Sequence, residues 1–538
     1  MTLHSLFLGI VLGAVVGVLY VLPVRPARCA YAESVFTAGS LGIPLWAVVS
    51  IIVLPAAGGN GPQWAANGMR ALFPQFVGWV LYGASLGLTA QALSDLAFRL
   101  LGPEPAARAV PIAKTRVVIL GGGFAGMQTA ECLERQFGAD RSVSFTLVSE
   151  GNALLFTPML AEVAGGSLEP SHISSPLRTS LNRTEVLRAH VTSVDCKRRC
   201  VLAHSGSGSD PEEIPYDHLI FALGSVSNYF GNTNVRNSAF DFKSLLDAIR
   251  IRNHVIGMFE LADQEASNSA RQELLTFVIA GGGFAGVELA GALNDFARGI
   301  LADYPRLTPE DVKVILVHSR EVILPELSAA LGAYARRSME DRGVHFELGR
   351  RVVDAAPGLV VLDNREVPAR TLVWTAGTVP NPLIRETGLE TDKRGAVRVD
   401  TTLAVPAHPG LWGIGDCAAV VDAKNGKSCP PTAQFALREG QLLARNIRAA
   451  ILGKKLEDFH FDSLGAFCVV GHHTACAELN LPWPIRKSVR FSGLLAWLMW
   501  RGIYLSKLPG AERKVRVFID WTTELFFPRD IVQTIDLK

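Results

Sequence analysis

The chain has 538 residues, several times the roughly 100–200 of a typical domain, so it has room for two or three hydrophobic cores. Apolar residues make up 49% and charged residues 19%, a composition that excludes an intrinsically disordered protein. The formal net charge of +2 provides no global field to attract nucleic acid, so no nucleic-acid partner is expected. Eight cysteines in a chain of this length are too sparse for a disulfide scaffold.

Residues 1–100 differ sharply in composition from the rest of the chain. Three stretches without charge, 3–22, 35–55 and 71–93, each have about the 20 residues that a helix needs to cross a bilayer. They predict a transmembrane region with three spans. A cleaved signal peptide is the alternative for the first stretch, although it lacks a basic start.

The loops around these stretches predict the orientation of the protein. Arg25 and Arg28 follow the first stretch, and Arg99, Arg108 and Lys114 follow the third. Because basic residues favour the cytoplasmic side, we expect a multi-pass protein of the cell membrane with its body on the cytoplasmic face. Residues 101–114, which include three prolines, read as a linker to that body.

A repeated glycine motif dominates the body. Residues 117–126 read VVILGGGFAG and residues 277–286 read FVIAGGGFAG, each between a β-branched run and a helix-forming run. Glycines at this spacing let the backbone turn tightly and approach a pyrophosphate at a helix N-terminus. We therefore predict two dinucleotide sites, with glycine-rich turns as the alternative. The predicted binding residues are Gly121, Gly123, Phe124, Ala125 and Gly126 in the first copy, and Gly281, Gly283 and Gly286 in the second.

The strand after each glycine loop suggests which nucleotide binds. The first, 144–150, ends in Glu150, which would accept hydrogen bonds from ribose hydroxyls. The second, 312–320, ends in His318, Ser319 and Arg320, where an acid is usual. Hydroxyl and cationic donors suit a ribose 2′-phosphate, so NADPH is predicted to be at least tolerated. Binding of NADH without an acidic contact remains the alternative.

Later strands place the second nucleotide module inside the first. Apolar strands at 217–225 and 371–378 end in small-residue turns, and 409–419 puts Asp416 at a strand end. The predicted fold class is therefore α/β, with two interleaved Rossmann-like domains. Residues 115–235 and 371–460 form one domain, and 240–370 form the other.

Several motifs in order resemble type II NADH dehydrogenases, the single-subunit FAD-containing NADH:quinone oxidoreductases. Besides both glycine loops, the resemblance includes residues 152–178 (NALLFTPMLAEVAGGSLEPSHISSPLR), VWTAG, GIGDCA and AQFALREG (433–440), and it spans 116–537. It implies a glutathione-reductase-like arrangement, with FAD on 115–235 and 371–460 and NADH or NADPH on 240–370. It also implies that the amphipathic region 461–538 docks on the lipid bilayer, and a homodimer is one possible assembly. The three N-terminal spans are foreign to the family pattern.

The resemblance also implies roles for single residues. Gly121, Gly123, Gly126 and Glu150 would contact the adenosine diphosphate of FAD, and Asp416 its ribityl-pyrophosphate end. Glu288 resembles the glutamate near the nicotinamide–flavin contact, and Gln434 the first glutamine of the quinone motif. Arg438 stands where the second glutamine is expected. These last three residues are the candidates for catalysis with a membrane quinone, while a helix-start carboxylate and an ordinary polar residue are the alternatives for Glu288 and Gln434.

Cysteine positions bear on the competing functions. Residues 151–175 hold no cysteine, which argues against a flavin disulfide reductase. Cys417 and Cys429 leave a sulfide:quinone oxidoreductase-like flavoprotein open. A membrane-anchored NAD(P)H-responsive redox sensor is a second alternative, although a sensor needs no FAD motifs. His472 and His473 lack a third ligand at metal spacing, so no metal site is expected.

Overall fold

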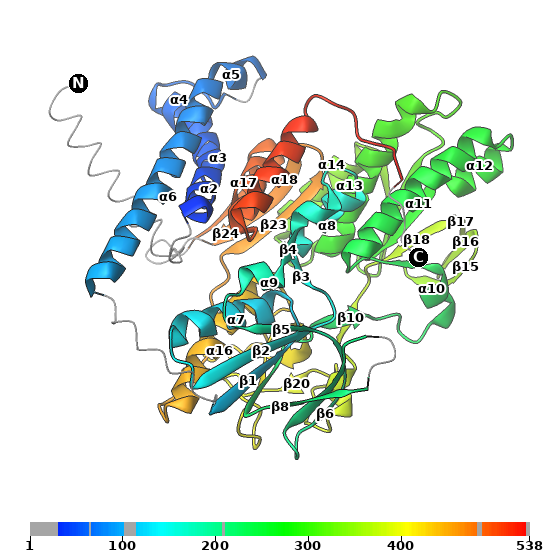
Figure 1. Ribbon diagram of the computed structural model, residues 1–538. Helices are drawn as coiled ribbons and strands as arrows, with labels where there is room; N and C mark the ends of the chain where they lie inside the picture. The colour runs from blue at the N-terminus through cyan, green and yellow to red at the C-terminus, as the bar shows by residue number, and fades with distance from the viewer. Residues whose placement is uncertain (1–30, 64–65, 102–113, 207–209, 481–486, 534–538) are drawn as a thin grey trace, which may run out of the picture.

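The computed structural model of the protein describes residues 31–63, 66–101, 114–206, 210–480 and 487–533. The first predicted span, 3–22, and most of the predicted linker lie outside the described residues. The described part consists of an N-terminal helical region, two parallel sheets with their helices, and a C-terminal sheet with two helices (Figure 1).

The first parallel sheet has the strand order β21-β9-β1-β2-β5. Its helices α7 and α16 pack on one face over Val117 and Ile119, and an antiparallel meander covers the other face over Val118 and Leu120. The apolar run of the central strand is thus buried on both sides, as parallel sheets require. The bounds are β1 (Thr115–Leu120), β2 (Val143–Ser149), β5 (Glu185–Arg188), β9 (His218–Phe221), β21 (Leu411–Gly413), α7 (Phe124–Phe137), α16 (Ala433–Ile451), and the meander β6 (His190–Asp195), β7 (Cys200–His204) and β8 (Glu212–Pro215).

The second parallel sheet repeats this plan with the order β11-β18-β12-β13-β14. The helices α11 and α13 cover one face, and a second meander covers the other. In both sheets the strand before the glycine loop lies at the point where strand order reverses, which is where dinucleotides bind. The bounds are β11 (Phe240–Asp241), β12 (Thr276–Ala280), β13 (Lys313–His318), β14 (Val344–Leu348), β18 (Thr371–Trp374), α11 (Leu245–Gln264), α13 (Phe284–Ile300), α14 (Ala329–Glu340), β15 (Val352–Ala356), β16 (Leu359–Leu362) and β17 (Glu366–Pro368).

Two short linkers join the modules. The chain leaves the first sheet after β9 through β10 (Ser225–Ser227) and returns after β18 through β19 (Thr378–Pro380). These linkers pair with each other in antiparallel register. The prediction of two interleaved Rossmann-like sheets is confirmed.

The C-terminal region forms a further layer. Strands β23 (Gly465–Gly471), β24 (Thr474–Asn480) and β25 (Ser488–Ser492) make an antiparallel sheet, followed by α17 (Gly493–Lys507) and α18 (Ala511–Thr523). The sheet lies directly on α13, because a Cβ added at Gly291 would be 2.8 Å from the Val470 carbonyl oxygen.

Within the described residues, two N-terminal helices are long and apolar enough to cross a membrane: Tyr31–Ala57 and Phe73–Ala97. They correspond to the predicted spans 35–55 and 71–93. The first is continuous through α2 (Tyr31–Ser40), α3 (Gly42–Leu45), the π-helix η1 (Trp46–Val53) and α4 (Leu54–Ala57), and the second lies in α6 (Phe73–Leu101). Small residues allow the backbones to touch: a Cβ at Gly83 would lie 2.3 Å from the Ala38 carbonyl oxygen.

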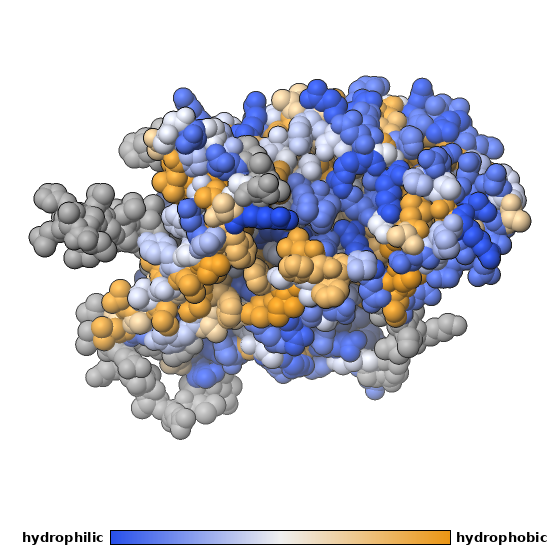
Figure 2. All heavy atoms as spheres, turned by 90° about the horizontal axis from the view of Figure 1, so that it is seen from above, coloured by the Kyte–Doolittle hydropathy of each residue, from blue (hydrophilic) through white to orange (hydrophobic). Residues whose placement is uncertain are grey.

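These helices are packed onto the C-terminal region (Figure 1). A Cβ added at Gly502 in α17 would lie 2.4 Å from Cδ of Pro44 in α3. In α18, Lys514 is almost fully buried and donates to Glu33 of α2. Apolar side chains gather on the outer surface of the N-terminal helices, as Figure 2 shows on its left side.

Candidate functional site

The first glycine loop has the shape of a phosphate cradle. Gly121 has φ +112°, and a Cβ there would lie 2.2 Å from the Ala222 carbonyl oxygen. A Cβ at Gly126 would lie 1.9 Å from the Gly121 carbonyl oxygen, so α7 packs on its strand only with glycine there. At Gly123, by contrast, an added Cβ would meet no heavy atom within 4 Å. The loop is tight on its protein side and open where a pyrophosphate would approach, which fits FAD.

Glu150 follows β2 directly, as predicted, and its side chain is 72% exposed. One of its oxygens, Oε1, lies 2.7 Å from Nδ1 of His190. The carboxylate is thus oriented by an imidazole on the neighbouring meander while remaining open to a ribose. This partner could not be recognised from the sequence, because His190 belongs to a different strand.

Asp416 belongs to the turn η5 (Gly415–Cys417), just beyond the carboxyl end of β21. Ser225 donates its hydroxyl to Asp416 at 2.7 Å, and Nζ of Lys243 donates to the same hydroxyl at 2.7 Å. Burial lowers the pKa of Lys243, and the charge of Asp416 opposes that shift. The roles of Ser225, at the end of the 217–225 stretch, and of Lys243 were missed in the sequence, since their hydrogen bonds join segments far apart in the chain.

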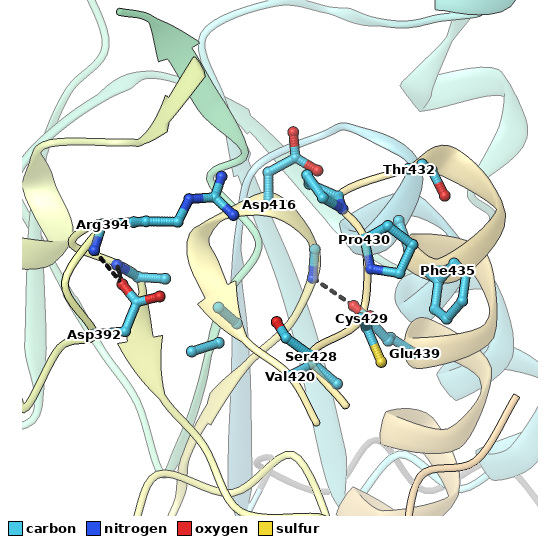
Figure 3. Close-up of a pocket in the computed structure, with 16 residues that line it drawn as sticks. Asp392, Arg394, Asp416, Val420, Ser428, Cys429, Pro430, Thr432, Phe435 and Glu439 are labelled. Carbon is cyan, nitrogen blue, oxygen red and sulfur yellow. Dashed lines mark hydrogen bonds between the residues drawn. The ribbon is translucent and has the colours of Figure 1, made fainter. Parts of the chain in front are cut away.

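A pocket beside this turn connects it to the start of α16. Figure 3 shows Asp416, Thr432 and Phe435 around it. The Gly415 amide donates to Glu439 Oε2 at 2.7 Å, which fixes the turn to the helix. Burial raises the pKa of Glu439 to about 7, so this carboxyl titrates near neutral pH.

The second glycine loop has the same shape as the first. Gly281 has φ +125°, and a Cβ there would lie 2.4 Å from Oγ1 of Thr375. A Cβ at Gly286 would again lie 1.9 Å from the carbonyl oxygen of the first glycine, and at Gly283 the nearest atom would be 3.9 Å away. The second dinucleotide thus has an equivalent cradle at the switch point of its own sheet.

Strand register shows which residue replaces Glu150 in the second module. The first glycine of each loop donates its amide to the neighbouring strand, Gly121 to Val148 and Gly281 to Val317. Two residues beyond these acceptors stand Glu150 and Ser319 respectively. The position of the ribose acid is therefore filled by an uncharged hydroxyl.

His318 lies beneath the second loop. Its Nδ1 accepts a hydrogen bond from the Gly282 amide at 3.1 Å, and burial lowers its pKa, so the ring is neutral. His318 thus helps to fix the second glycine loop through the Gly282 amide, a role that the sequence did not indicate. The predicted contacts of His318 and Arg320 with a nucleotide stay predictions.

Glu288 lies in the second turn of α13 and faces the C-terminal sheet. Its Oε1 accepts a hydrogen bond from the Val469 amide at 3.3 Å. Burial, and to a smaller degree the charge of Glu162, raises the pKa of Glu288 to about 8. The carboxyl is therefore protonated at neutral pH, unlike a helix-start carboxylate that stabilises the helix dipole.

Gln434, in the first turn of α16, contacts the same C-terminal sheet. Its amide donates to the Gly465 carbonyl oxygen at 3.1 Å and accepts from the Leu464 amide at 3.0 Å. Gly465 begins β23 and Val469 lies four residues further on, so Gln434 and Glu288 hold points on this strand roughly 13 Å apart.

Arg438 lies one turn further along α16 than Gln434. Its guanidinium stacks over Phe461 at 5.3 Å and donates to Gln441 at 3.1 Å. Burial lowers its pKa. The Arg438 guanidinium is thus held against the Phe461 ring by Gln441 of the same helix, and neither of these two contacts is a carboxylate.

The cysteines near the flavin module are not activated as nucleophiles. Burial raises the pKa of both Cys417 and Cys429 to about 12, so both remain thiols at neutral pH. In the part of the chain that the structure describes, no group of three His, Cys, Asp or Glu residues is placed to hold a metal ion.

Two glycine cradles on two interleaved parallel sheets define the class of two-dinucleotide flavoprotein oxidoreductases. The family model for pyridine nucleotide-disulphide oxidoreductases matches residues 115–440, and the model for the NDH2 C-terminal domain matches residues 464–530. Both matches begin after the N-terminal helices.

Comparison with curated relatives identifies the family within this class of flavoproteins. The chain is 31% identical over 445 residues to a type II NADH:quinone oxidoreductase of Mycobacterium tuberculosis, covering 80% of this chain and 92% of that protein. It is 31% identical over 428 residues to a probable NADH dehydrogenase of Dictyostelium discoideum, covering 78% and 91%. The fold is similar to that of NDH2 from Plasmodium falciparum in complex with NADH, with a TM-score of 0.71 and 19% identity, over 78% of this chain and all of that one.

The chain belongs to the type II NADH:quinone oxidoreductase family. It is an FAD-dependent flavoprotein enzyme with NADH as substrate and a quinone as electron acceptor.

Proposed function

We propose that NADH oxidation and quinone reduction occur at one site between the two nucleotide modules. The observation that carries this is the pairing of β10 with β19. Each linker begins a few residues beyond the carboxyl end of its sheet strand, so the two carboxyl edges are joined at close range. Dinucleotides bound at both edges then meet between the modules.

Within this proposal, residues 115–235 and 371–460 bind FAD and residues 240–370 bind NADH. The first glycine loop holds the FAD pyrophosphate, Glu150 the adenosine ribose, and Asp416 the ribityl end. When bound by these residues, FAD would supply the acceptor for the hydride of NADH and the donor of two electrons to the quinone. Lys243 and Ser225 keep Asp416 in position through their hydrogen bonds.

Glu288 supplies a proton to the quinone in this proposal, because its carboxyl is neutral at pH 7 and close to the C-terminal sheet. Gln434 shapes the quinone site by holding the start of β23. Arg438 places a positive charge beside that site.

Replacing Gln434 by Leu tests the quinone assignment. We expect lower quinone turnover with unchanged anaerobic reduction of the flavin by NADH, because only the strand beside the quinone is released. The exposed Gln264 at the end of α11 provides the matched control, Gln264→Leu. Unchanged quinone turnover in Gln434→Leu would remove this residue from the site.

We also propose that NADPH is accepted beside NADH. Ser319, at the register of the ribose acid, does not repel a 2′-phosphate, and Arg320 follows it. We expect Arg320→Ala to lower kcat/KM for NADPH more than for NADH. A wild-type protein with a strong preference for NADH would contradict this proposal.

The N-terminal helices make the protein a multi-pass membrane protein in this proposal, with the catalytic body on the cytoplasmic face. Phe518 and Ile519 on α18 are exposed, as are Leu525, Phe526 and Phe527 beyond it, and they suit insertion into a bilayer surface. Alkaline carbonate extraction should leave the protein in the membrane pellet. Release into the supernatant would contradict the spans.

A further inference from the structure

A buried ionic cluster connects the first nucleotide module to the C-terminal region. Glu162 comes from α8 (Leu160–Ala164), Arg501 from α17, and Glu524 and Arg529 from the segment after α18. The side chains of Arg501 and Glu524 are only 9% and 8% exposed. Such a cluster is costly to bury, and the proposed function leaves it without a role.

The two arginines of the cluster form their hydrogen bonds with Glu524 rather than with Glu162. Arg501 donates to Glu524 Oε2 at 3.1 Å, and Arg529 donates to Glu524 Oε1 at 2.9 Å. Arg501 is held there by the rings of Trp497 and Trp521, whose centroids lie 3.8 and 4.6 Å from its guanidinium carbon. Both arginines therefore stabilise the ionised carboxylate of Glu524, and they lower its pKa despite burial.

Glu162 is fixed in place and yet lacks a close ion pair. The indole of Trp521 donates to Glu162 Oε2 at 3.1 Å, while Arg501 stays 4.0 Å from Oε1, beyond hydrogen-bond distance. Burial raises the pKa of Glu162 to about 7. The charges of Arg501 and Arg529 lower this pKa, whereas the negative charge of Glu524 raises it. This carboxyl thus gains and loses a proton close to neutral pH.

Glu162 is linked electrostatically to Glu288 and, through Arg501 and Glu524, to a solvent cavity. On one side α8 packs on α13, since a Cβ at Gly165 would be 3.0 Å from the Ala292 carbonyl oxygen, and the charge of Glu162 raises the pKa of Glu288. On the other side, beyond Arg501 and Glu524, a cavity of about 320 Å³ opens to solvent. Glu524 lines this cavity, together with Ser167, which donates to Glu524 at 2.8 Å.

We propose that Glu162 carries protons from this cavity to Glu288 during quinone reduction. The inference rests on the proposed function. NADH brings two electrons and one hydrogen nucleus as a hydride, whereas a quinone needs two electrons and two protons to become a quinol. One proton for each turnover therefore comes from water, and Glu162 takes it up and passes it to Glu288, which delivers it to a quinone oxygen.

The chemistry of the two carboxyls suits a proton exchange near neutral pH. Burial raises the pKa of Glu162 to about 7 and that of Glu288 to about 8, so each can hold a proton at neutral pH and the proton can pass between them without a large change in free energy. Arg501, Arg529 and Glu524 keep their charges and hold Glu162 in place. Glu162 is therefore a positioned proton carrier that touches neither nucleotide in this scheme.

The substitution Glu162→Gln tests this proposal in the FAD-loaded full-length enzyme. Glutamine keeps an acceptor for Trp521 but cannot carry a proton. We expect kcat for quinone reduction to fall ~10- to 100-fold while KM for NADH is unchanged, in the range that proton transfer by one side chain contributes. Anaerobic flavin reduction by NADH should keep its rate, and azide or formate should restore part of the turnover.

Glu131→Gln is the matched control, because Glu131 in α7 has a pKa that burial also raises to about 7 and it lies outside the cluster. It should match the wild type. If Glu162→Gln unfolds, Glu162→Asp keeps a carboxyl, and its activity should exceed that of any stable neutral variant. Independently of activity, the infrared difference spectrum of the wild type on NADH addition should contain a carboxyl band that Glu162→Asp shifts.

Two results would overturn the inference. One is an unchanged kcat and pH profile in Glu162→Gln, and the other is an infrared spectrum in which Glu162→Asp shifts no band. Failure of the proposed function is a different result, since the wild type itself would then reduce no quinone.

Discussion

The neutral state of Glu288 has a consequence for stability that Glu288→Gln would reveal. An isolated glutamate has a pKa near 4.5, and burial raises that of Glu288 to about 8. Between these values the folded protein binds a proton that the unfolded chain releases. Stability therefore falls as pH rises from about 4.5 to 8, and the contribution of Glu288 is complete only below this window.

The magnitude follows from the pKa change. At ~1.4 kcal/mol for each tenfold change in proton affinity, the loss at alkaline pH is about 5 kcal/mol. An unfolding entropy of ~2.1 cal/mol/K per residue gives about 1.1 kcal/mol/K for the whole chain, so the melting temperature falls by about 4 °C. The fall is larger if the second module unfolds separately.

Thermal unfolding of the wild type and Glu288→Gln at pH 5, 7 and 9 measures this effect. Glutamine carries no charge at any of these pH values. The melting temperature of the variant, relative to that of the wild type, should therefore rise by about 4 °C between pH 5 and pH 9. Glu185→Gln, on the exposed side of β5, should follow the wild type throughout. A constant difference between Glu288→Gln and the wild type across this range would refute the assignment of a neutral, buried carboxyl.

Three further substitutions test the packing. Gly502→Ala places a methyl group 2.4 Å from Cδ of Pro44, so thermal unfolding should show a loss of about 1–3 kcal/mol. Lys514→Met leaves Glu33 without its buried partner and should cost about 2 kcal/mol, part of which Glu33→Gln in the same chain should restore. Phe230→Asn should stabilise the protein by about 1 kcal/mol, because Phe230 has φ +52° in a tight turn and its ring is 69% exposed. A lower melting temperature for Phe230→Asn would show that the contacts of the Phe230 ring stabilise the protein more than its positive φ destabilises it.

The nucleotide modules could be predicted from sequence because their signals are local. Each glycine loop lies in ten consecutive residues that also contain the end of a strand and the start of a helix. The exact residue at the ribose position was less accessible. It depends on strand register, which places Ser319 rather than His318 at the position equivalent to Glu150, while His318 accepts a hydrogen bond from the Gly282 amide.

Contacts between distant segments could not be predicted. Glu162 meets Arg501 and Trp521 across more than 300 residues, and each looks like an ordinary helix residue in its own segment. The N-terminal helices gave a similar difficulty. Their composition predicted a transmembrane region but not what it packs against, and Glu33 and Pro44 pack directly on the C-terminal helices.

The contact of α2 and α3 with α17 and α18 joins the beginning of the chain to its end. At ~5–20 residues per second, a ribosome needs about 20–90 s to proceed from residue 57 to residue 493. During this interval α2 and α3 lack the C-terminal helices on which they pack in the folded protein. Final assembly therefore waits until α17 and α18 have been synthesised, so a message truncated before α17 would yield a protein with both nucleotide modules and with α2 and α3 uncovered.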